Sequence, residues 1–395
     1  MNKYRLIIIC CCAVFAFASC KKDKVDYRYP TPFDGQTVQL PGIAGNEEGY
    51  YAANSVFVDF SRGVVSAARR DSWNLGLYPG PEFKVIINHS MGAMAVETEK
   101  TDLTAVGADD SIAIATNKVN GTLNFNSPIS SQRINPVTGN ATDYLSKLTL
   151  IKVGASEAES KVYIVSSGMA GTTRNRIPPT TPPPAGTPPI TPVLLQFPWY
   201  KFKVYEGVNG YRIKYGLINS QAFTEFTINK NASYNFNYLS FNSRSVNVEP
   251  AKSLWDIQWT WTTYQDANGK PDSTSNFVLI NFLGGVKAAQ LTVTAAKTFE
   301  NFTKDDLGSI KDTDYSDTRD AIGTKWRTIS ETVDKDNNKV QVARVNSNLF
   351  YVIKDSEGNF YKLRFRSAGT GVDGGANGRP IIEYKLVQGV ANPSL

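Results

Sequence analysis

"YVIKDSEGNFYKLRF", residues 351–365, is the stretch that decides the fold. Apolar and polar residues alternate on both sides of its centre, as they do in half-buried β-strands. The centre, "DSEGN" (355–359), is rich in residues that favour turns. Two alternating runs around a short turn predict a β-hairpin.

Similar runs fill most of the chain, and they are short and rich in β-branched and aromatic residues. They occur at 55–60, 83–87, 146–153, 161–165, 201–205, 277–282, 349–353 and 360–365. Turn signals such as "DANGKPD" (266–272) and "DKDNNK" (334–339) separate them. No long amphipathic helix is evident. The sequence therefore predicts an all-β, mostly antiparallel fold.

The N-terminus has the features of a lipoprotein signal. "MNKYR" is basic, and the apolar run "LIIICCCAVFAF" that follows is too short to span a bilayer comfortably. Small residues then precede Cys20 in "FASC", the order found in a lipobox. This predicts a signal peptide over 1–19, lipid attachment at Cys20, a tether over 20–36, and a location at the outer membrane or cell surface. A plain secretory signal is the alternative.

Cysteine usage and charge exclude several classes of site. All four cysteines lie within the first 20 residues, so the mature chain has no disulfide framework and no thiolate metal site. Removing 1–19 takes away two of the 42 basic residues and leaves 40 against 36 acidic ones, a charge of +4. No run of basic residues interleaved with aromatics occurs, which argues against nucleic-acid binding.

The chain also repeats itself. "FKVIINHSMGAMA" (83–95) and "FVLINFLGGVKAA" (277–289) each run from a strand to Asn, with Gly four residues later and Ala seven residues later. Neighbouring segments correspond in the same order, which predicts a tandem duplication with domains at 37–220 and 221–395. The Pro-rich stretch 177–192 then becomes a loop insertion inside a hairpin of the first domain, where insertions cost little. An interdomain linker is the alternative.

The repeated unit resembles the HmuY-like family of haem-binding surface lipoproteins. The resemblance is carried by the 351–365 hairpin, the closing strand "IIEYKL" (381–386), and a W-[DN]-[LI] pattern at Trp255–Asp256–Ile257 and Trp73–Asn74–Leu75. It implies a binding module rather than an enzyme, with haem as the cofactor to be captured or delivered. A membrane anchor and an outer-membrane transporter are the implied partners.

Family members hold haem iron with two His or Met side chains that come from the segment between the small-residue turn and the second hairpin. Here the corresponding segments, 99–160 and 292–348, contain neither residue type. Tyr315 lies in the second segment, and tyrosine is a known haem ligand. The resemblance therefore carries over the fold and leaves the iron ligands open.

His89, the only histidine in the chain, lies beside Met91 and Met94. Imidazole and thioether groups bind haem iron or copper, so these three residues are candidate cofactor ligands; simple packing in a turn is the alternative. Ser90 resembles the serine of a nucleophile elbow. However, the only available base is its immediate neighbour, which cannot pair with it, so the sequence argues against a hydrolase.

The strand "SLWDIQWTWTTY" (253–264) places several tryptophans on one face. Trp259 and Trp261 are candidate stacking residues for a sugar or porphyrin, and core packing is the alternative. The acidic segments 334–339 and 312–320 lack the spacing of a calcium loop and are interpreted as solvated loops. The second candidate function is therefore a surface accessory protein that binds carbohydrate or a protein partner. A structural spacer is the third.

Overall fold

The computed structural model describes residues 31–43, 52–107, 110, 118–119, 122–123, 134–136, 138–168, 199–265, 271–333, 339–370, 373, 375–376 and 378–390. Residues Pro32–Val390 form one compact unit. Across the described ranges, no helix has the length and apolar character needed to cross a membrane. Cys20, the signal peptide and the Pro-rich stretch 177–192 lie outside the described residues.

The first half of the chain contributes β1 (Gly35–Gln39), β2 (Asn54–Asp59), β3 (Val64–Arg69), β4 (Leu75–Leu77), β5 (Val85–Ile87), β6 (Met94–Glu97), β7 (Lys118–Val119), β8 (Thr122–Leu123), β9 (Tyr163–Ser166), β10 (Trp199–Gly207) and β11 (Gly210–Leu217). The second half contributes β12 (Thr224–Asn229), β13 (Asn237–Ser240), β14 (Arg244–Val246), β15 (Ile257–Gln265), β16 (Pro271–Ile280), β17 (Lys287–Thr292), β18 (Arg327–Val333), β19 (Lys339–Val345), β20 (Leu349–Lys354), β21 (Phe360–Ser367) and β22 (Ile381–Gln388).

The helical elements are short. They are η1 (Arg70–Ser72), η2 (His89–Met91), η3 (Leu103–Ala105), α3 (Ala141–Lys147), η5 (Phe282–Gly284), η6 (Lys304–Ser309) and η7 (Asp312–Asp314). The predicted all-β class is confirmed, and every strand pair in the named sheets is antiparallel.

The described residues form four larger sheets and two two-stranded ones, β18-β19 and β7-β8. Two have five strands, in the orders β1-β22-β21-β20-β17 and β12-β11-β10-β9-β6. Two have four strands, in the orders β14-β13-β4-β5 and β16-β15-β2-β3. The sheets show the expected alternation, for example in β11, where buried Tyr211, Ile213 and Tyr215 are separated by less buried residues.

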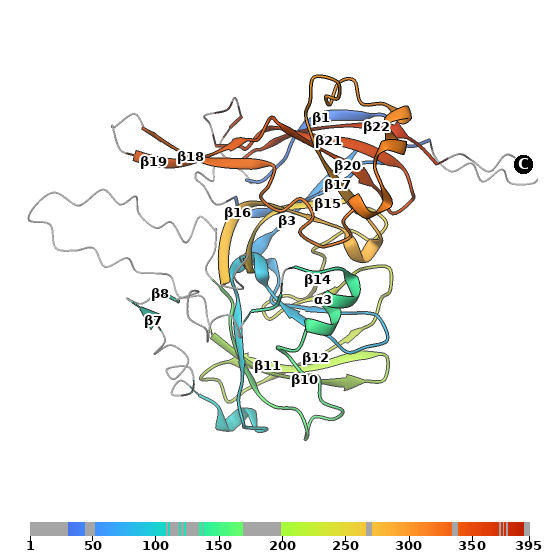
Figure 1. The fold of residues 1–395 in the computed structure, drawn as a ribbon. Helices are drawn as coiled ribbons and strands as arrows, with labels where there is room; N and C mark the ends of the chain where they lie inside the picture. Colours follow the sequence, from blue (N-terminus) through green and yellow to red (C-terminus); the bar gives the residue numbers. More distant parts are fainter. Residues whose placement is uncertain are drawn as a thin grey trace, which may run out of the picture. The chain divides into compact units, whose positions relative to one another are not determined.

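The strand partners cross the middle of the chain. In Figure 1, β1 lies beside β22 although the two strands are at opposite ends of the sequence. β2 pairs with β15, while β13 pairs with β4 and β12 pairs with β11. These pairings join strands on the two sides of residue 220. The domain boundary predicted near that residue stays a prediction about the sequence repeat.

Two main cores lie between the sheets. One contains Phe60 of the first half with Ile257, Tyr361 and Tyr384 of the second. The other contains Val85, Phe202 and Ile213 with Leu239 and Phe241, which come from the β13 region. Each core therefore needs residues from both halves of the sequence.

The 351–365 hairpin forms as predicted, because β20 and β21 pair across the "DSEGN" turn. Asp355 organises that turn by accepting hydrogen bonds from the backbone N–H of Glu357 (2.9 Å) and Asn359 (2.7 Å). In the first half, β9 and β10 pair in the same way. The segment that contains the Pro-rich stretch therefore connects two strands of one hairpin.

One predicted strand is wrong. The run 146–153 begins inside a helix, α3, and continues as irregular chain. The helix starts after Asn140, whose side chain accepts a hydrogen bond from the Asp143 N–H. Leu148 and Ile151 are buried and lie three residues apart, so burial in this segment does not have the period of two that a strand shows. An alternating sequence therefore does not by itself produce a strand.

Candidate functional site

The segment after β5 is a tight turn held by one asparagine. Asn88 precedes η2 (His89–Met91), which ends at Gly92 with φ of 69°, a conformation that favours glycine. The Asn88 side chain is fully buried, and its Nδ2 donates hydrogen bonds to the backbone oxygens of Arg70 and Trp73, both at 2.7 Å. These bonds attach the turn to the chain that leads into β4.

The segment after β16 forms the same turn. Asn281 precedes η5, and Gly285 ends it with φ of 94°. The Asn281 Nδ2 donates to the backbone oxygens of Lys252 (2.6 Å) and Trp255 (2.8 Å). As the sequence comparison predicts, the shared asparagine and glycine are the framework of both turns.

Ser90 has a structural role in the first turn. It is 1 % exposed, and its Oγ donates a hydrogen bond to Asn88 Oδ1 at 2.7 Å. The neighbouring imidazole makes its bonds elsewhere. The geometry agrees with the sequence argument against a nucleophile elbow, since that role needs a base hydrogen-bonded to the serine.

His89 is buried, and both ring nitrogens have partners. Nε2 lies 2.8 Å from an Arg319 guanidinium nitrogen, and Nδ1 lies 2.9 Å from Thr262 Oγ1. Arginine only donates, so Nε2 accepts and the proton lies on Nδ1. Thr262 Oγ1 in turn donates to the Thr263 backbone oxygen. Burial, together with the Arg319 charge, lowers the pKa of His89 well below its ordinary value, and the ring is neutral.

Met91 and Met94 are each 1 % exposed. The structure thus places all three candidate ligands of this segment in the interior, with the imidazole nitrogens occupied and the thioethers enclosed. Across the described ranges, no group of three or more His, Cys, Asp or Glu side chains is placed to hold a metal ion.

Tyr315 follows η7 and packs edge-on against Phe360, with ring centroids 5.9 Å apart. Its hydroxyl is buried and has no hydrogen-bond partner among the residues that the structure describes. Burial first, and then the charges of Asp312 and Asp314, raise the pKa of Tyr315 to about 12. Phenolate ligation of iron is therefore opposed by its surroundings.

Trp259 and Trp261 are 2 % and 7 % exposed, so neither ring presents an open face. Trp259 belongs to the main core. Trp261 lies 5.8 Å from the guanidinium carbon of Arg70, which sits over its ring. In the structure, the predicted stacking residues are core residues, which is the alternative that the sequence left open.

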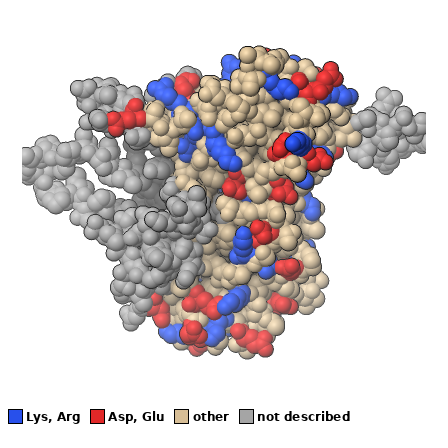
Figure 2. Space-filling view, in the orientation of Figure 1, with Lys and Arg blue, Asp and Glu red and all other residues tan. Residues whose placement is uncertain are grey.

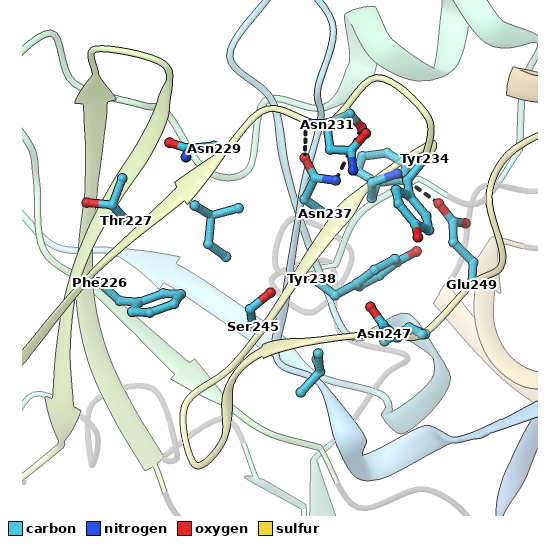
Figure 3. Close-up of a pocket in the computed structure, with 14 residues that line it drawn as sticks. Phe226, Thr227, Asn229, Asn231, Tyr234, Asn237, Tyr238, Ser245, Asn247 and Glu249 are labelled. Atoms are coloured by element: carbon cyan, nitrogen blue, oxygen red, sulfur yellow. Dashed lines mark hydrogen bonds between the residues drawn. The ribbon is translucent and has the colours of Figure 1, made fainter.

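A cavity of about 360 Å³ lies between β12 and the β13–β14 hairpin. Figure 3 shows Tyr234, Tyr238, Asn247 and Glu249 near one end of this pocket, while Phe226 points toward it from β12. The full lining is Phe226, Thr227, Ile228, Asn229, Asn231, Tyr234, Phe236, Asn237, Tyr238, Ser245, Val246, Asn247, Val248 and Glu249. None of these residues is among the candidates taken from the sequence.

Glu249 is the one charged residue in the described lining. It is 7 % exposed, and its Oε1 accepts a hydrogen bond from the Phe236 N–H at 2.8 Å. Burial raises the pKa of Glu249 to about 7, against the opposing effects of its hydrogen bonds and the Arg319 charge. Near neutral pH the group is therefore about half protonated.

A compositional signal for the pocket is present in the sequence. Six asparagines lie between 229 and 247, interleaved with aromatic residues in "NKNASYNFNYLSFNSRSVN". Elsewhere the visible surface is mixed: Figure 2 shows acidic and basic side chains interspersed on that face, with no continuous basic area. The asparagine density marks the segment, but only folding shows that it borders a cavity.

Comparison with curated proteins and with solved structures finds no match. A family model described as HmuY protein matches residues 51–384, which is most of the chain. That range takes in β2 through the first half of β22, including both turns, both hairpins and the pocket. The chain therefore belongs to the HmuY family.

Proposed function

We propose that the chain is a non-catalytic binding protein, held at the outer membrane or cell surface by a lipid on Cys20, and that it captures haem there. The family match over residues 51–384 carries this proposal. An outer-membrane transporter is the partner that such a role implies. The buried, asparagine-bonded Ser90 supports a protein without hydrolase chemistry.

The described side chains do not fit a pair of His or Met iron ligands. Both nitrogens of His89 are engaged, and the two described methionines are enclosed. Exposing His89 would leave the buried guanidinium of Arg319 without its acceptor, and leaving a buried donor unsatisfied is costly. The proposal is therefore haem capture that does not use His89, Met91 or Met94.

The test is a titration of the mature chain, from Cys20 onward, with haemin under oxidising and reducing conditions. We expect a Soret shift that saturates at a defined stoichiometry. If neither condition produces a shift, haem capture is wrong.

The His89→Gln variant is the matched control for the ligand assignment. Glutamine keeps one acceptor for Arg319 and one donor for Thr262, so the fold is preserved. We expect the same Soret shift as in the unmodified chain. A lost or altered shift in a folded His89→Gln protein would show that the imidazole leaves its buried position to bind iron.

A further inference from the structure

The pocket between β12 and the β13–β14 hairpin contains polar groups that the protein itself does not use. Ser245 and Asn247 are exposed, and their side chains make no hydrogen bond to another residue within the described ranges. The Tyr234 hydroxyl is likewise without a partner there. These groups comprise hydroxyl and amide donors and acceptors.

The β12 side of the pocket combines apolar and polar residues, because Thr227 and Asn229 alternate there with two apolar side chains. Phe226 is half-buried and points toward the cavity, and Ile228 on the same strand lines it. Val246 adds a further apolar side chain from β14. A ligand that fills the pocket therefore meets apolar side chains as well as hydrogen-bond donors and acceptors.

The charge of the lining restricts the ligand further. No Lys, Arg or His lines the described pocket, and Glu249 is its single acid. The nearby Lys230 ammonium is directed elsewhere, since its Nζ donates to the Gly80 oxygen at 2.7 Å and lies 3.8 Å from the centre of the Phe83 ring. The cation nearest the lining is Arg244 at the rim, whose guanidinium carbon lies 6.0 Å from the centre of the Phe226 ring. The lining itself therefore has no cation to pair with a buried carboxylate, phosphate or sulfate group.

The cavity volume of about 360 Å³ is near the lower end of small-molecule sites, which span roughly 300–1,000 Å³. A pyranose ring combines hydroxyl groups at its edge with an apolar C–H face, and aromatic side chains pack well against such faces. Its size, its neutrality and its combination of hydroxyl groups with an apolar face match this lining.

We propose that the pocket between β12 and the β13–β14 hairpin binds a neutral sugar, as a terminal residue of a glycan. Asn247, Ser245 and Tyr234 hydrogen-bond its hydroxyl groups, and Phe226 with Ile228 covers its apolar face. This site is separate from the haem proposal, which rests on the family match and assigns no pocket.

The first test is binding of the mature chain to an array of neutral and anionic oligosaccharides, followed by titration calorimetry with methyl glycosides of glucose, galactose, mannose and N-acetylglucosamine. We expect binding to neutral glycans through their chain ends and to at least one methyl glycoside. No neutral binding, or binding confined to sialylated or sulfated glycans, overturns the proposal.

Variants at the pocket rim place the binding site. Asn247→Ala removes one hydrogen-bonding side chain and should weaken binding about tenfold. Ser245→Trp fills the cavity from an exposed position and should abolish binding. The matched controls are Asn348→Ala and Ser243→Trp, both at exposed positions outside the lining, and they should bind as the unmodified chain does. Thermal unfolding confirms that each variant is folded.

The outcomes separate this proposal from haem capture. Ser245→Trp should lose the sugar and keep the haemin Soret shift. Sugar binding that persists in a folded Ser245→Trp protein would place the site elsewhere and overturn the assignment. A haemin shift that disappears in this variant would mean that the pocket holds haem, which also overturns the sugar proposal.

Discussion

The turns at 88–92 and 281–285 share one backbone conformation and differ in the residue that follows the asparagine. Each begins with a buried asparagine that donates to two backbone oxygens, and each ends with a glycine at positive φ. After the asparagine, the first turn has His89, bonded to Thr262 and Arg319. The second has Phe282, whose ring packs edge-on against Tyr144 at 5.3 Å.

This difference shows which residues belong to the turn and which belong to its surroundings. The asparagine and glycine satisfy local backbone demands, so both turns need them. The residue between them faces a distant part of the chain, so it follows the chemistry found there: an arginine and a threonine in one case, an aromatic ring in the other. Substitutions of the asparagine, of the residue after it and of the glycine test this comparison.

The largest effect is expected at the asparagines. Asn88→Asp and Asn281→Asp keep the shape but remove the donors to two backbone oxygens, which then remain buried and unsatisfied. We expect each change to lower the free energy of unfolding by about 3 kcal/mol, measured by urea denaturation. Asn348→Asp, at an exposed position, is the control. A loss below about 0.5 kcal/mol at either turn, the usual range for neutral surface changes, would contradict the shared framework.

The next largest effect is expected when the residue after the asparagine in the first turn is replaced by that of the second. His89→Phe gives the first turn the residue of the second and strands the Arg319 guanidinium in the interior. We expect a loss of about 2 kcal/mol in the free energy of unfolding, with a smaller loss for His89→Gln. The double variant His89→Phe/Arg319→Leu should recover part of it, because both polar partners are then removed. Additive losses in this double-mutant cycle would show that the two side chains are not coupled.

The pH dependence of stability separates His89 from the pocket acid. The pKa of His89 is lowered on folding, so the unfolded chain binds the extra proton and stability falls as pH drops below about 6.5. The pKa of Glu249 is raised to about 7, so its contribution is present below about pH 4.5 and is lost as pH rises through 7. Arg319, Tyr238 and Tyr144 surround this carboxyl group.

The Glu249→Gln variant removes the loss of stability that the Glu249 carboxyl group causes as pH rises. We expect the variant to gain stability relative to the unmodified chain between pH 5 and pH 8, with a slope of up to about 1.4 kcal/mol per pH unit. Urea denaturation at a series of pH values measures it. Parallel stability curves for the two proteins would show that this carboxyl group titrates alike in the folded and unfolded chains.

The smallest effect is expected at the glycines. Gly92→Ala and Gly285→Ala force a side chain into the left-handed region, at a cost of about 1 kcal/mol each. A Cβ added at Gly285 would meet no atom within 4 Å, so backbone strain alone accounts for its loss. Gly285→Asn should recover part of the stability, since asparagine tolerates this conformation. Thermal unfolding measures these effects. If Gly92→Ala, Gly285→Ala and Gly285→Asn were all as stable as the unmodified chain, the conformational argument would be refuted.

Local patterns predicted the hairpins well and the site poorly. β20 and β21 follow from alternation around "DSEGN", because both the strands and the turn are encoded within 15 residues. The run 146–153 shows the same alternation but has no strand partner along it, so it remains irregular after α3. Trp259 and Trp261 are buried, and a stripe of aromatics looks the same in the sequence whether the face above it is open or covered.

By itself, the sequence determined the all-β class, the two hairpins and the Asn–Gly framework of the turns. These depend on interactions between residues close together in the chain. Tertiary structure alone decided that β1 pairs with β22 and β2 with β15. It also decided that Arg319 occupies one ring nitrogen of His89 and that a pocket lies beside β12. The physical reason is that strand edges and buried polar groups accept any complementary partner, and only the assembled core selects which distant segment supplies it.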